Sequence, residues 1–471
     1  EMLEGFSNKG MITVALLFLV SEGIRQSGTL GQVIKKLLPQ GKTTVFKAQL
    51  RILPSVAFIS AFLNNTPVVV IFAPIIKHWA KSVNLPATKF LIPLSYVTIL
   101  GGICTLIGTS TNLVVHGMIL EAGFEGFSMF ELGKVGVFIA IAGIIYLFLF
   151  SKRLLPDARP DTAVPDEEVE EGEKLHRVEA VLGARFPGIN KKLKDFNFQR
   201  HYGAEVKEIK TRNGQRFVSN LEEVVLHEGD TLVVMADDTF IPTWGESSVF
   251  VLLTNGNEPD TTGKKKRWFA LLLLVLMIVG ATVGELPITK EMFPDIKLDM
   301  FFFVSITTII MAWTNLFPAR KYTKYISWDI LITIACAFAI SKAMVNSGVA
   351  DSVAKFIIGL SDDYGPHVLL AMVFIITNLF TELITNNAAA ALAFPLALSI
   401  SAQLGVSPTP FFVVICMAAS ASFSTPIGYQ TNLIVQGIGN YKFTDFVRIG
   451  LPLNIITFLI SIILIPLIWN F

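Results

Sequence analysis

Two short polar segments lie within apolar stretches of the sequence, and each is centred on an asparagine pair. They read FLNNTP around Asn64–Thr66 and ITNNAA around Thr385–Asn387. If each pair lies at the turn of a helical hairpin, free backbone N–H groups and the positive end of a helix dipole meet there, which is chemistry that binds an anion. Polar residues in membrane helices also form ordinary interhelical hydrogen bonds, but two matching tips favour a binding site.

Two long apolar segments, residues 90–120 and 410–440, carry a polar, glycine-containing centre. The centres read GTSTN at Gly108–Asn112 and STPIGYQTN at Ser424–Asn432, as expected of helices broken partway through a membrane. Unwound backbone offers carbonyl and hydroxyl oxygens that suit Na⁺. Because neither asparagine tip carries Arg or Lys, we expect bound Na⁺ to neutralise a divalent anion in these low-dielectric surroundings.

The composition places these polar residues in a membrane. The chain has 471 residues, of which 52% are hydrophobic and 16% charged, with a mean hydropathy of +0.59. A net charge of +1 gives no basic field for a nucleic acid. Runs that are apolar on all sides predict membrane helices. The expected spans are 10–29, 90–120, 133–151, 267–286, 297–316, 327–346, 410–440 and 448–470.

The two membrane parts repeat in sequence. The segment that ends at Gly28 matches one that ends at Gly348, and IGTSTNLVVHG from Ile107 matches IGYQTNLIVQG from Ile427, both at an offset of 320. The second copy has two additional apolar helices before this match, so we expect two helices to precede the first copy. A complete copy would then hold an odd number of spans and a hairpin that does not cross, which inverts the second copy.

Loop charges test this inversion, because Lys and Arg accumulate on the cytoplasmic side of a membrane. If both hairpins are re-entrant, the basic loops fall on one side; they include QGKTTVFKAQLR, SKRLLPDAR, KKKRW and PARKYTKY. The tip at Asn64–Thr66 then opens from the inside and the tip at Thr385–Asn387 from the outside. We expect an integral protein of a bacterial inner membrane.

The predicted fold is an all-α polytopic membrane protein with an inverted repeat, two re-entrant hairpins, two broken helices and a small cytoplasmic α+β insertion. The expected domains are 1–154, 155–266 and 267–471, with the core of the insertion at about 177–240. Its predicted strands are AEVKEIKT, QRFV and DTLVVMAD, separated by the turn signals RNG and HEGD.

The asparagine tips and both membrane parts resemble the divalent anion/sodium symporter family, whose signature is a Ser-Asn-Thr motif at each tip. This resemblance implies two Na⁺ sites and a substrate site. The first Na⁺ site falls on Ser60, Asn64, Asn65 and Gly108. The second falls on Thr381, Ile384, Asn386 and Ser424. The substrate contacts fall on Asn65, Thr66, Asn386, Asn387, Thr425 and Pro426.

The chain departs from the signature at the tips. Asn64 and Thr385 each replace Ser, Asn387 replaces Thr, and Pro67 follows the first tip. Because the Asn387 amide is bulkier than a hydroxyl, it would shrink the pocket and favour a compact tetrahedral oxyanion over a four-carbon dicarboxylate. Glu382, beside the second tip, has an apolar match in Ala61 and is interpreted as a helix cap or as the partner of Lys342 in a salt bridge.

The insertion resembles the C-terminal subdomain of regulator-of-K⁺-conductance modules, through EEVVLHEGDTLVVMADD and the segment before it. No GxGxxG turn precedes this segment, so NAD is not implied. The resemblance leaves open whether the insertion is a cytoplasmic dimer cap or a sensor of a small ligand.

The leading functional hypothesis is a Na⁺-coupled symporter of a sulfate-like oxyanion or of a C4-dicarboxylate or citrate. A rigid transport domain would move against a homodimeric scaffold in the manner of an elevator. The alternatives are an anion exchanger that does not need Na⁺, a transporter of another oxyanion, and a membrane anion sensor that does not transport. The polar positions assemble no nucleophile, base and orienting group, so an enzyme is not expected.

Overall fold

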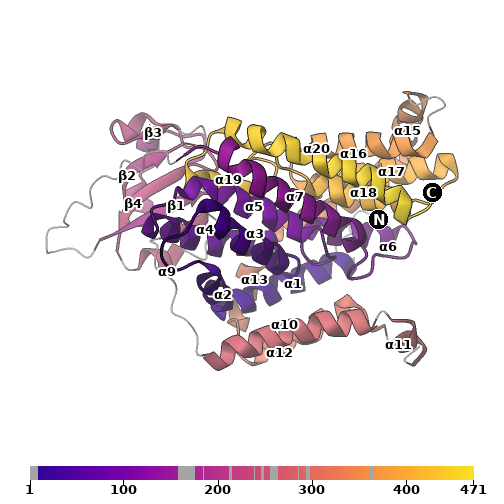
Figure 1. Cartoon of the computed structure of the whole chain (residues 1–471), viewed down its shortest axis with the longest axis horizontal. Coiled ribbons are helices and arrows are strands. Elements are labelled where there is room, and N and C mark those ends of the chain that lie inside the picture. The colour runs from indigo at the N-terminus through magenta and orange to yellow at the C-terminus, as the bar shows by residue number, and fades with distance from the viewer. Residues whose placement is uncertain are drawn as a thin grey trace.

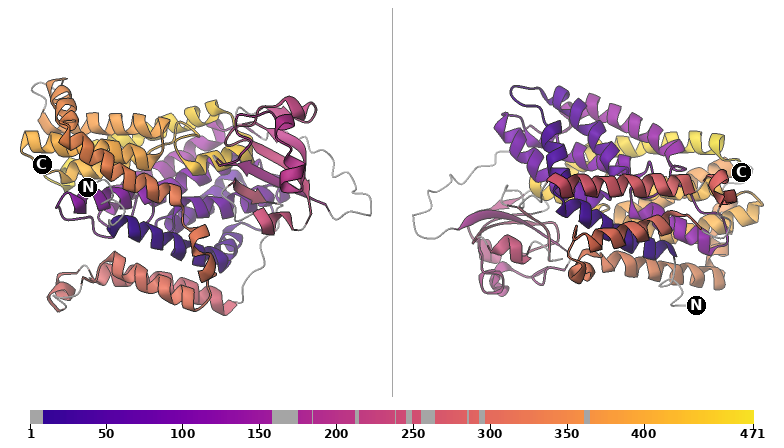
Figure 2. Two further views of the ribbon diagram at one scale, coloured as in Figure 1. Left: turned by 180° about the vertical axis from the view of Figure 1, so that it is seen from behind. Right: turned by 90° about the horizontal axis from the view of Figure 1, so that it is seen from below.

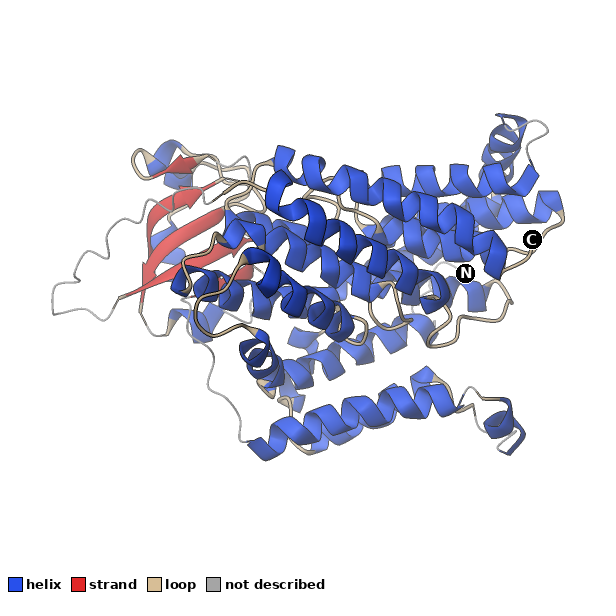
Figure 3. Ribbon diagram, in the orientation of Figure 1, coloured by secondary structure: helices blue, strands red, loops and turns tan. Residues whose placement is uncertain are grey.

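The computed structural model shows a helical bundle with a small sheet at one end and the C-terminus at the other (Figures 1 and 2). Figure 3 separates the helices from the strands by colour. The structure describes residues 9–157, 175–183, 185–211, 215–237, 239–244, 249–254, 264–284, 286–292, 297–360 and 365–471.

The first half of the bundle is helical throughout, apart from short turns. Its helices are α1 (Lys9–Gln26), α2 (Thr29–Leu37), α3 (Val45–Ser60), α4 (Asn65–Ser82), η2 (Ala87–Lys89), α5 (Leu91–Gly102), α6 (Ser110–Glu121) and α7 (Gly133–Leu154). Helices α3 and α4 are joined by a short turn at residues 61–64, where a hairpin is predicted, and α5 and α6 are separated by residues 103–109, where a broken helix is predicted. The breaks therefore lie where the polar motifs predict them.

The second half begins after the insertion and has the same order of hairpin and broken helix. Its helices are α10 (Lys264–Gly284), α11 (Pro287–Met292), α12 (Met300–Trp313), η5 (Ala319–Lys321), α13 (Tyr322–Tyr325), α14 (Trp328–Asn346), α15 (Val349–Leu360), α16 (Gly365–Leu383), α17 (Asn386–Leu404), α18 (Thr409–Ser420), α19 (Gln430–Gly439) and α20 (Phe443–Ile468). Helices α16 and α17 form the second hairpin, and α18 and α19 form the second broken helix.

Five helices in the described part of the chain are long and apolar enough to cross a membrane, namely α7, α10, α16, α17 and α20. This agrees with the polytopic character that the composition predicts. Length alone would also let both arms of the second hairpin cross, so the re-entrant course of the hairpins stays a prediction.

The first piece of each broken helix forms the centre of the bundle. All residues of α5 are buried, and so are those of α18 from Pro410 to Ser420. Helix α5 packs against α3, α4 and α7, while α18 packs against α16, α17 and α20. The second pieces cross over, because α19 packs against α4 of the first hairpin and α6 against α17 of the second. A helix that is apolar on all sides needs such complete cover.

The helices α1, α10, α12 and α14 lie together on one side of this core. Helix α1 contacts α6, α10, α12 and α14, and α14 also packs against α17. Figure 1 shows α10 and α12 along the lower edge of the bundle, separate from the hairpins and broken helices. The arrangement divides the helices into a group that carries the polar motifs and a neighbouring apolar group.

The insertion is an α+β unit whose sheet is larger than the sequence pattern indicates. Its strands are β1 (His176–Leu182), β2 (Glu205–Lys210), β3 (Arg216–Phe217), β4 (Thr231–Ala236) and β5 (Phe250–Thr254), in the antiparallel order β3-β2-β4-β1-β5. Short helices accompany it: η3 (Leu193–Asp195), α8 (Phe198–Tyr202), η4 (Leu221–Glu223) and α9 (Phe240–Trp244). Strand β5 lies beyond the expected core at 177–240. It extends the sheet by pairing with β1, whose other neighbour is β4.

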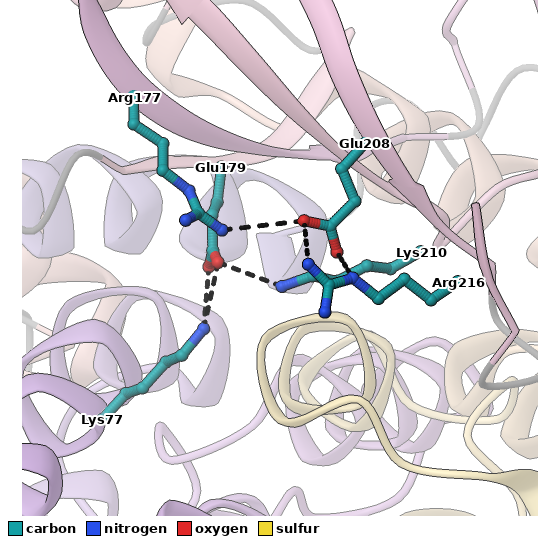
Figure 4. A network of polar contacts seen from close by, with 6 residues as sticks. All are labelled: Lys77, Arg177, Glu179, Glu208, Lys210 and Arg216. Atoms are coloured by element: carbon teal, nitrogen blue, oxygen red, sulfur yellow. Dashed lines mark hydrogen bonds and ion pairs between the residues drawn. The ribbon is translucent and has the colours of Figure 1, made fainter. Parts of the chain in front are cut away.

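A network of ion pairs fixes the sheet to the first hairpin (Figure 4). Lys77 of α4 lies 3.0 Å from a carboxylate oxygen of Glu179 on β1, and Lys210 of β2 lies 3.2 Å from the other oxygen. Burial alone would raise the pKa of Glu179, but the charges and hydrogen bonds of the two lysines lower it to about 2. The carboxylate is therefore held ionised between the insertion and the hairpin.

Candidate functional site

The first hairpin tip begins a new helix without a side-chain cap. Asn64 is the N-cap of α4, and its side chain makes no cap hydrogen bond. Asn65, which is 1% exposed, accepts a hydrogen bond of 2.7 Å from the hydroxyl of Ser60 across the turn. The first N–H groups of a helix have no partner within the helix. The tip therefore orders its amide through Ser60 and leaves the end of α4 without a side-chain cap.

The second tip repeats this arrangement. Thr385 is the N-cap of α17, and its side chain makes no cap hydrogen bond either. Asn387, 8% exposed, accepts hydrogen bonds from the hydroxyls of Ser110 at 3.3 Å and Thr111 at 3.2 Å, both in α6. The second tip is thus seated on the second piece of the first broken helix.

The first tip makes the reciprocal contact. The hydroxyl of Thr66 donates to Oε1 of Gln430 in α19 at 3.3 Å. In the repeat, Thr66 corresponds to Asn387 at an offset of 321, and Ser110 corresponds to Gln430 at an offset of 320. Each tip therefore meets the helix start of the other half of the chain at corresponding positions.

Tyr429 joins the two halves at their centre. Its hydroxyl accepts a hydrogen bond of 2.5 Å from the Asn65 amide and lies 3.0 Å from the hydroxyl of Thr109. The Asn386 side chain of the second tip lies near enough to influence the same hydroxyl. One buried phenol therefore joins the first asparagine tip to Thr109 at the start of α6, beside the second tip, which the sequence analysis did not anticipate.

Four helix starts converge at this point. The N-caps are Asn64, Thr109, Thr385 and Tyr429, which precede α4, α6, α17 and α19, and none of their side chains caps its own helix. Each start carries backbone N–H groups and the positive end of a dipole. Together they supply backbone donors suited to an anion.

Each break is held open by a matching set of hydrogen bonds. Asn112 donates to the carbonyls of Gly102 and Thr105, and Asn432 donates to those of Ser422 and Thr425. The two sets differ by an offset of 320 at every position. In each copy of the TN motif, the Asn side chain therefore holds the unwound backbone through hydrogen bonds to its carbonyls.

Backbone oxygens gather closely at the first break. A Cβ atom at Gly108 would lie 2.5 Å from the Gly102 carbonyl oxygen and 3.0 Å from that of Ala61. A Cβ at Gly102 would lie 2.7 Å from Oδ1 of Asn65. Only glycine permits this approach. Ser60, Asn65 and Gly108, three of the residues expected at the first Na⁺ site, are therefore brought together around hard oxygen atoms, with Asn64 at the adjoining turn.

The second break contains the corresponding oxygens but adds a carboxylate. Thr381 and Ser422 form a hydrogen bond at 3.3 Å, and a Cβ at Gly428 would lie 2.3 Å from the Thr381 carbonyl oxygen. Ser424 borders the same break, whereas Ile384 lies at the tip with 37% of its surface exposed. The substrate positions Thr425 and Pro426 follow directly in this break.

Glu382 is the added carboxylate, and it acts as a cap. It accepts hydrogen bonds from the backbone N–H of Ser424 at 2.9 Å and from the Asn454 amide of α20 at 2.7 Å. Among the described residues none of its hydrogen-bond partners is basic, so the structure favours capping over the alternative salt bridge to Lys342. Asn454 was missed because its partner lies 72 residues away, and its only signal is a polar residue in an apolar helix.

Comparison with known proteins adds the family context. A family described as citrate transporters matches residues 1–405 and 296–470. An uncharacterized transporter of Synechocystis sp. is 29% identical over 100% of the chain and 90% of its own length. A Chlamydomonas reinhardtii protein provisionally named a sulfur deprivation response regulator is 28% identical over 98% of the chain and 93% of its own length. Sodium/sulfate cotransporter 2 of the same alga is 31% identical over 59% of the chain and 31% of its own length.

Proposed function

We propose that this membrane anion transporter couples the uptake of a small divalent anion to a Na⁺ gradient. The chain belongs to the citrate transporter family and to the divalent anion/sodium symporters that its sequence resembles. The observation that carries this proposal is the convergence of four helix starts, none capped by its own N-cap side chain, between the asparagine tips. The substrate is a sulfate-like oxyanion or, alternatively, a C4-dicarboxylate or citrate.

The anion binds where the two tips face each other. The contacts are backbone and side-chain donors of Asn65, Thr66, Asn386, Asn387, Thr425 and Pro426, with Pro426 contributing shape alone because it has no N–H. No Lys or Arg stands within either tip sequence. Helix dipoles stabilise an anion by modest amounts, so a divalent charge in this buried place needs further compensation.

Na⁺ supplies that compensation and is carried as a second substrate. The first cation binds among Ser60, Asn64, Asn65 and Gly108, and the second among Thr381, Ile384, Asn386 and Ser424. The close approach of carbonyl oxygens at Gly102 and Gly108 supports the first position. The cations and the anion are then bound side by side, so that neither is stable alone, which is the thermodynamic basis of symport.

The two groups of helices support an elevator mechanism. The hairpins and broken helices move as one body, while α10 and α12, with their neighbours, form the stationary part of a homodimer. The domains 1–154, 155–266 and 267–471 are two inverted repeats and a cytoplasmic insertion in a bacterial inner membrane. This proposal rests on the offset of 320 that relates both the sequence motifs and the hydrogen bonds of Asn112 and Asn432.

Uptake by proteoliposomes tests the function. Purified protein is reconstituted, and radiolabelled sulfate, succinate and citrate are supplied with an inward Na⁺ gradient or with K⁺ in its place. Accumulation of one anion above its equilibrium level only with the Na⁺ gradient is the expected result. Accumulation that does not need Na⁺ would indicate an exchanger, and binding without any uptake would indicate a sensor.

A further inference from the structure

Tyr429 occupies a position that helix capping does not explain. It is the N-cap of α19, where Asn, Asp, Ser and Thr are the preferred residues, and its side chain makes no cap hydrogen bond. Its match in the first repeat is Thr109, which has a small side chain. Where the repeat has a small residue, this chain therefore places a large phenol, and the ring lies between the two tips.

The hydroxyl of Tyr429 orients the donors of the first tip. A phenol has one proton and room for two accepted hydrogen bonds. Asn65 and Thr109 fill two of these places, so the hydroxyl fixes the Asn65 amide relative to the start of α6. The Asn386 side chain of the second tip lies near the same atom. The tyrosine is also buried, with 6% of its surface exposed. The polar groups around Tyr429 therefore gather at one atom.

The remaining tip contacts limit the length of a ligand. Thr66 meets Gln430, the residue after Tyr429, and Asn387 meets Ser110 and Thr111, the two residues after Thr109. A four-carbon dicarboxylate carries its charges at two ends and needs two separated groups of donors. A tetrahedral oxyanion carries its charge around one central atom and suits donors that converge.

We propose that Tyr429 is the residue that determines specificity, and that it selects a compact tetrahedral oxyanion over elongated dicarboxylates and citrate by filling the space beside the tips and fixing the amide of Asn65 against the start of α6. This inference rests on the proposed function, since it assigns the substrate class of the same site. In this proposal the volume of the Tyr429 ring has one role and the hydrogen bonds of its hydroxyl have another, and a separate substitution can remove each of them.

Two substitutions separate these roles. Y429F keeps the ring and removes the hydroxyl, so we expect the KM for sulfate to rise about tenfold while the preference for sulfate over succinate persists. Y429T restores the residue of the first repeat and opens the space, so we expect the ratio of kcat/KM for succinate to that for sulfate to rise at least about tenfold. The matched control is Y146F, because the Tyr146 hydroxyl donates to the Ile449 carbonyl away from the tips and its loss leaves the ratio unchanged.

Initial rates of Na⁺-driven uptake in proteoliposomes give the ratios of kcat/KM. For a variant that binds but transports slowly, binding of radiolabelled sulfate and succinate to protein in detergent gives the corresponding ratio of affinities. An unchanged ratio in Y429T, by uptake or by binding, would overturn the inference. So would a wild-type protein that prefers succinate or citrate, although the proposed symport would then still stand. Na⁺-independent behaviour of the wild type would instead overturn the proposed function.

Discussion

The first and second hairpins have the same core and different surroundings. Both begin their second arm at a helix start that no side chain caps, and both lie beside a break held by an Asn side chain. The first hairpin is neutral at Ala61 and is tied to the insertion through Lys77. The second hairpin carries Glu382, which α20 holds through Asn454. The repeat therefore preserves the binding chemistry and varies the charge and the attachment.

This difference has a physical consequence for the two cation sites. The first site offers neutral oxygens only, whereas the second lies beside a carboxylate whose hydrogen-bond partners are neutral. Glu382 is half-buried, and a carboxylate whose described hydrogen-bond partners are all neutral attracts a cation. We expect the second site to bind Na⁺ more tightly than the first. We expect the insertion, which contacts the first hairpin, to affect Na⁺ binding at the first site.

The largest effect is expected from the feature that the hairpins share. N65A removes the amide that donates to Tyr429 and leaves the Ser60 hydroxyl without its acceptor, and N386A removes the corresponding amide of the second tip. Both variants should lose Na⁺-driven uptake by about a hundredfold or more, which corresponds to roughly 3 kcal/mol. Q403A, on the far end of α17, is a suitable control because the Gln403 side chain donates to Asp351 and Ser399, away from the tips. Normal uptake by either tip variant would refute the site.

Neutralising the second hairpin should have the next largest effect. E382Q keeps the shape of the side chain and removes its charge, so the Na⁺ concentration for half-maximal uptake should rise about tenfold, with a smaller change in the KM for the anion. E382A should also lower the thermal stability, because the Ser424 N–H and the Asn454 amide lose an acceptor. An E382Q variant whose Na⁺ dependence equals that of the wild type would remove the distinction between the two cation sites.

Loosening the first hairpin from the insertion should have a moderate effect. K77M keeps the aliphatic stem and removes one of the two lysines that hold Glu179. We expect faster hydrogen exchange in β1 and a two- to fivefold fall in uptake rate, in line with about 0.5–1 kcal/mol for a partly exposed ion pair. The control is K207M, because Lys207 pairs with Glu205 on the exposed face of the same sheet. Equal exchange in both variants would show that the insertion does not depend on Lys77.

The smallest effect is expected from pH. The pKa of Glu179 is lowered to about 2, so its contribution to docking is complete above its ordinary pKa near 4.5 and is lost only as the pH falls toward 2. Hydrogen-exchange protection of β1 should therefore be the same at pH 8 and pH 5 once the intrinsic exchange rates are corrected. A loss of protection between pH 7 and pH 5 would assign the docking to a different titrating group.

Local patterns predicted most of the elements of the fold. The breaks at Gly108–Asn112 and Ser424–Asn432 and the two hairpin turns were visible because glycine and polar residues interrupt apolar runs at repeated positions. Strands β2, β3 and β4 were also found from their alternation and their turns. Strands β1 and β5 were not predicted, because each is defined by its pairing partners.

The sequence by itself determined the membrane character, the repeat and the polar tips, because hydropathy, helix length and turn chemistry depend on neighbouring residues. Only the tertiary structure decided that Tyr429 meets Asn65, 364 residues away, that Glu382 is held by Asn454, and that Lys77 holds the insertion. These contacts depend on which helix faces are packed together. The hydrogen bond between the first tip and Tyr429 is therefore a property of the packing, and it leads from an anion site to a proposal about which anion it selects.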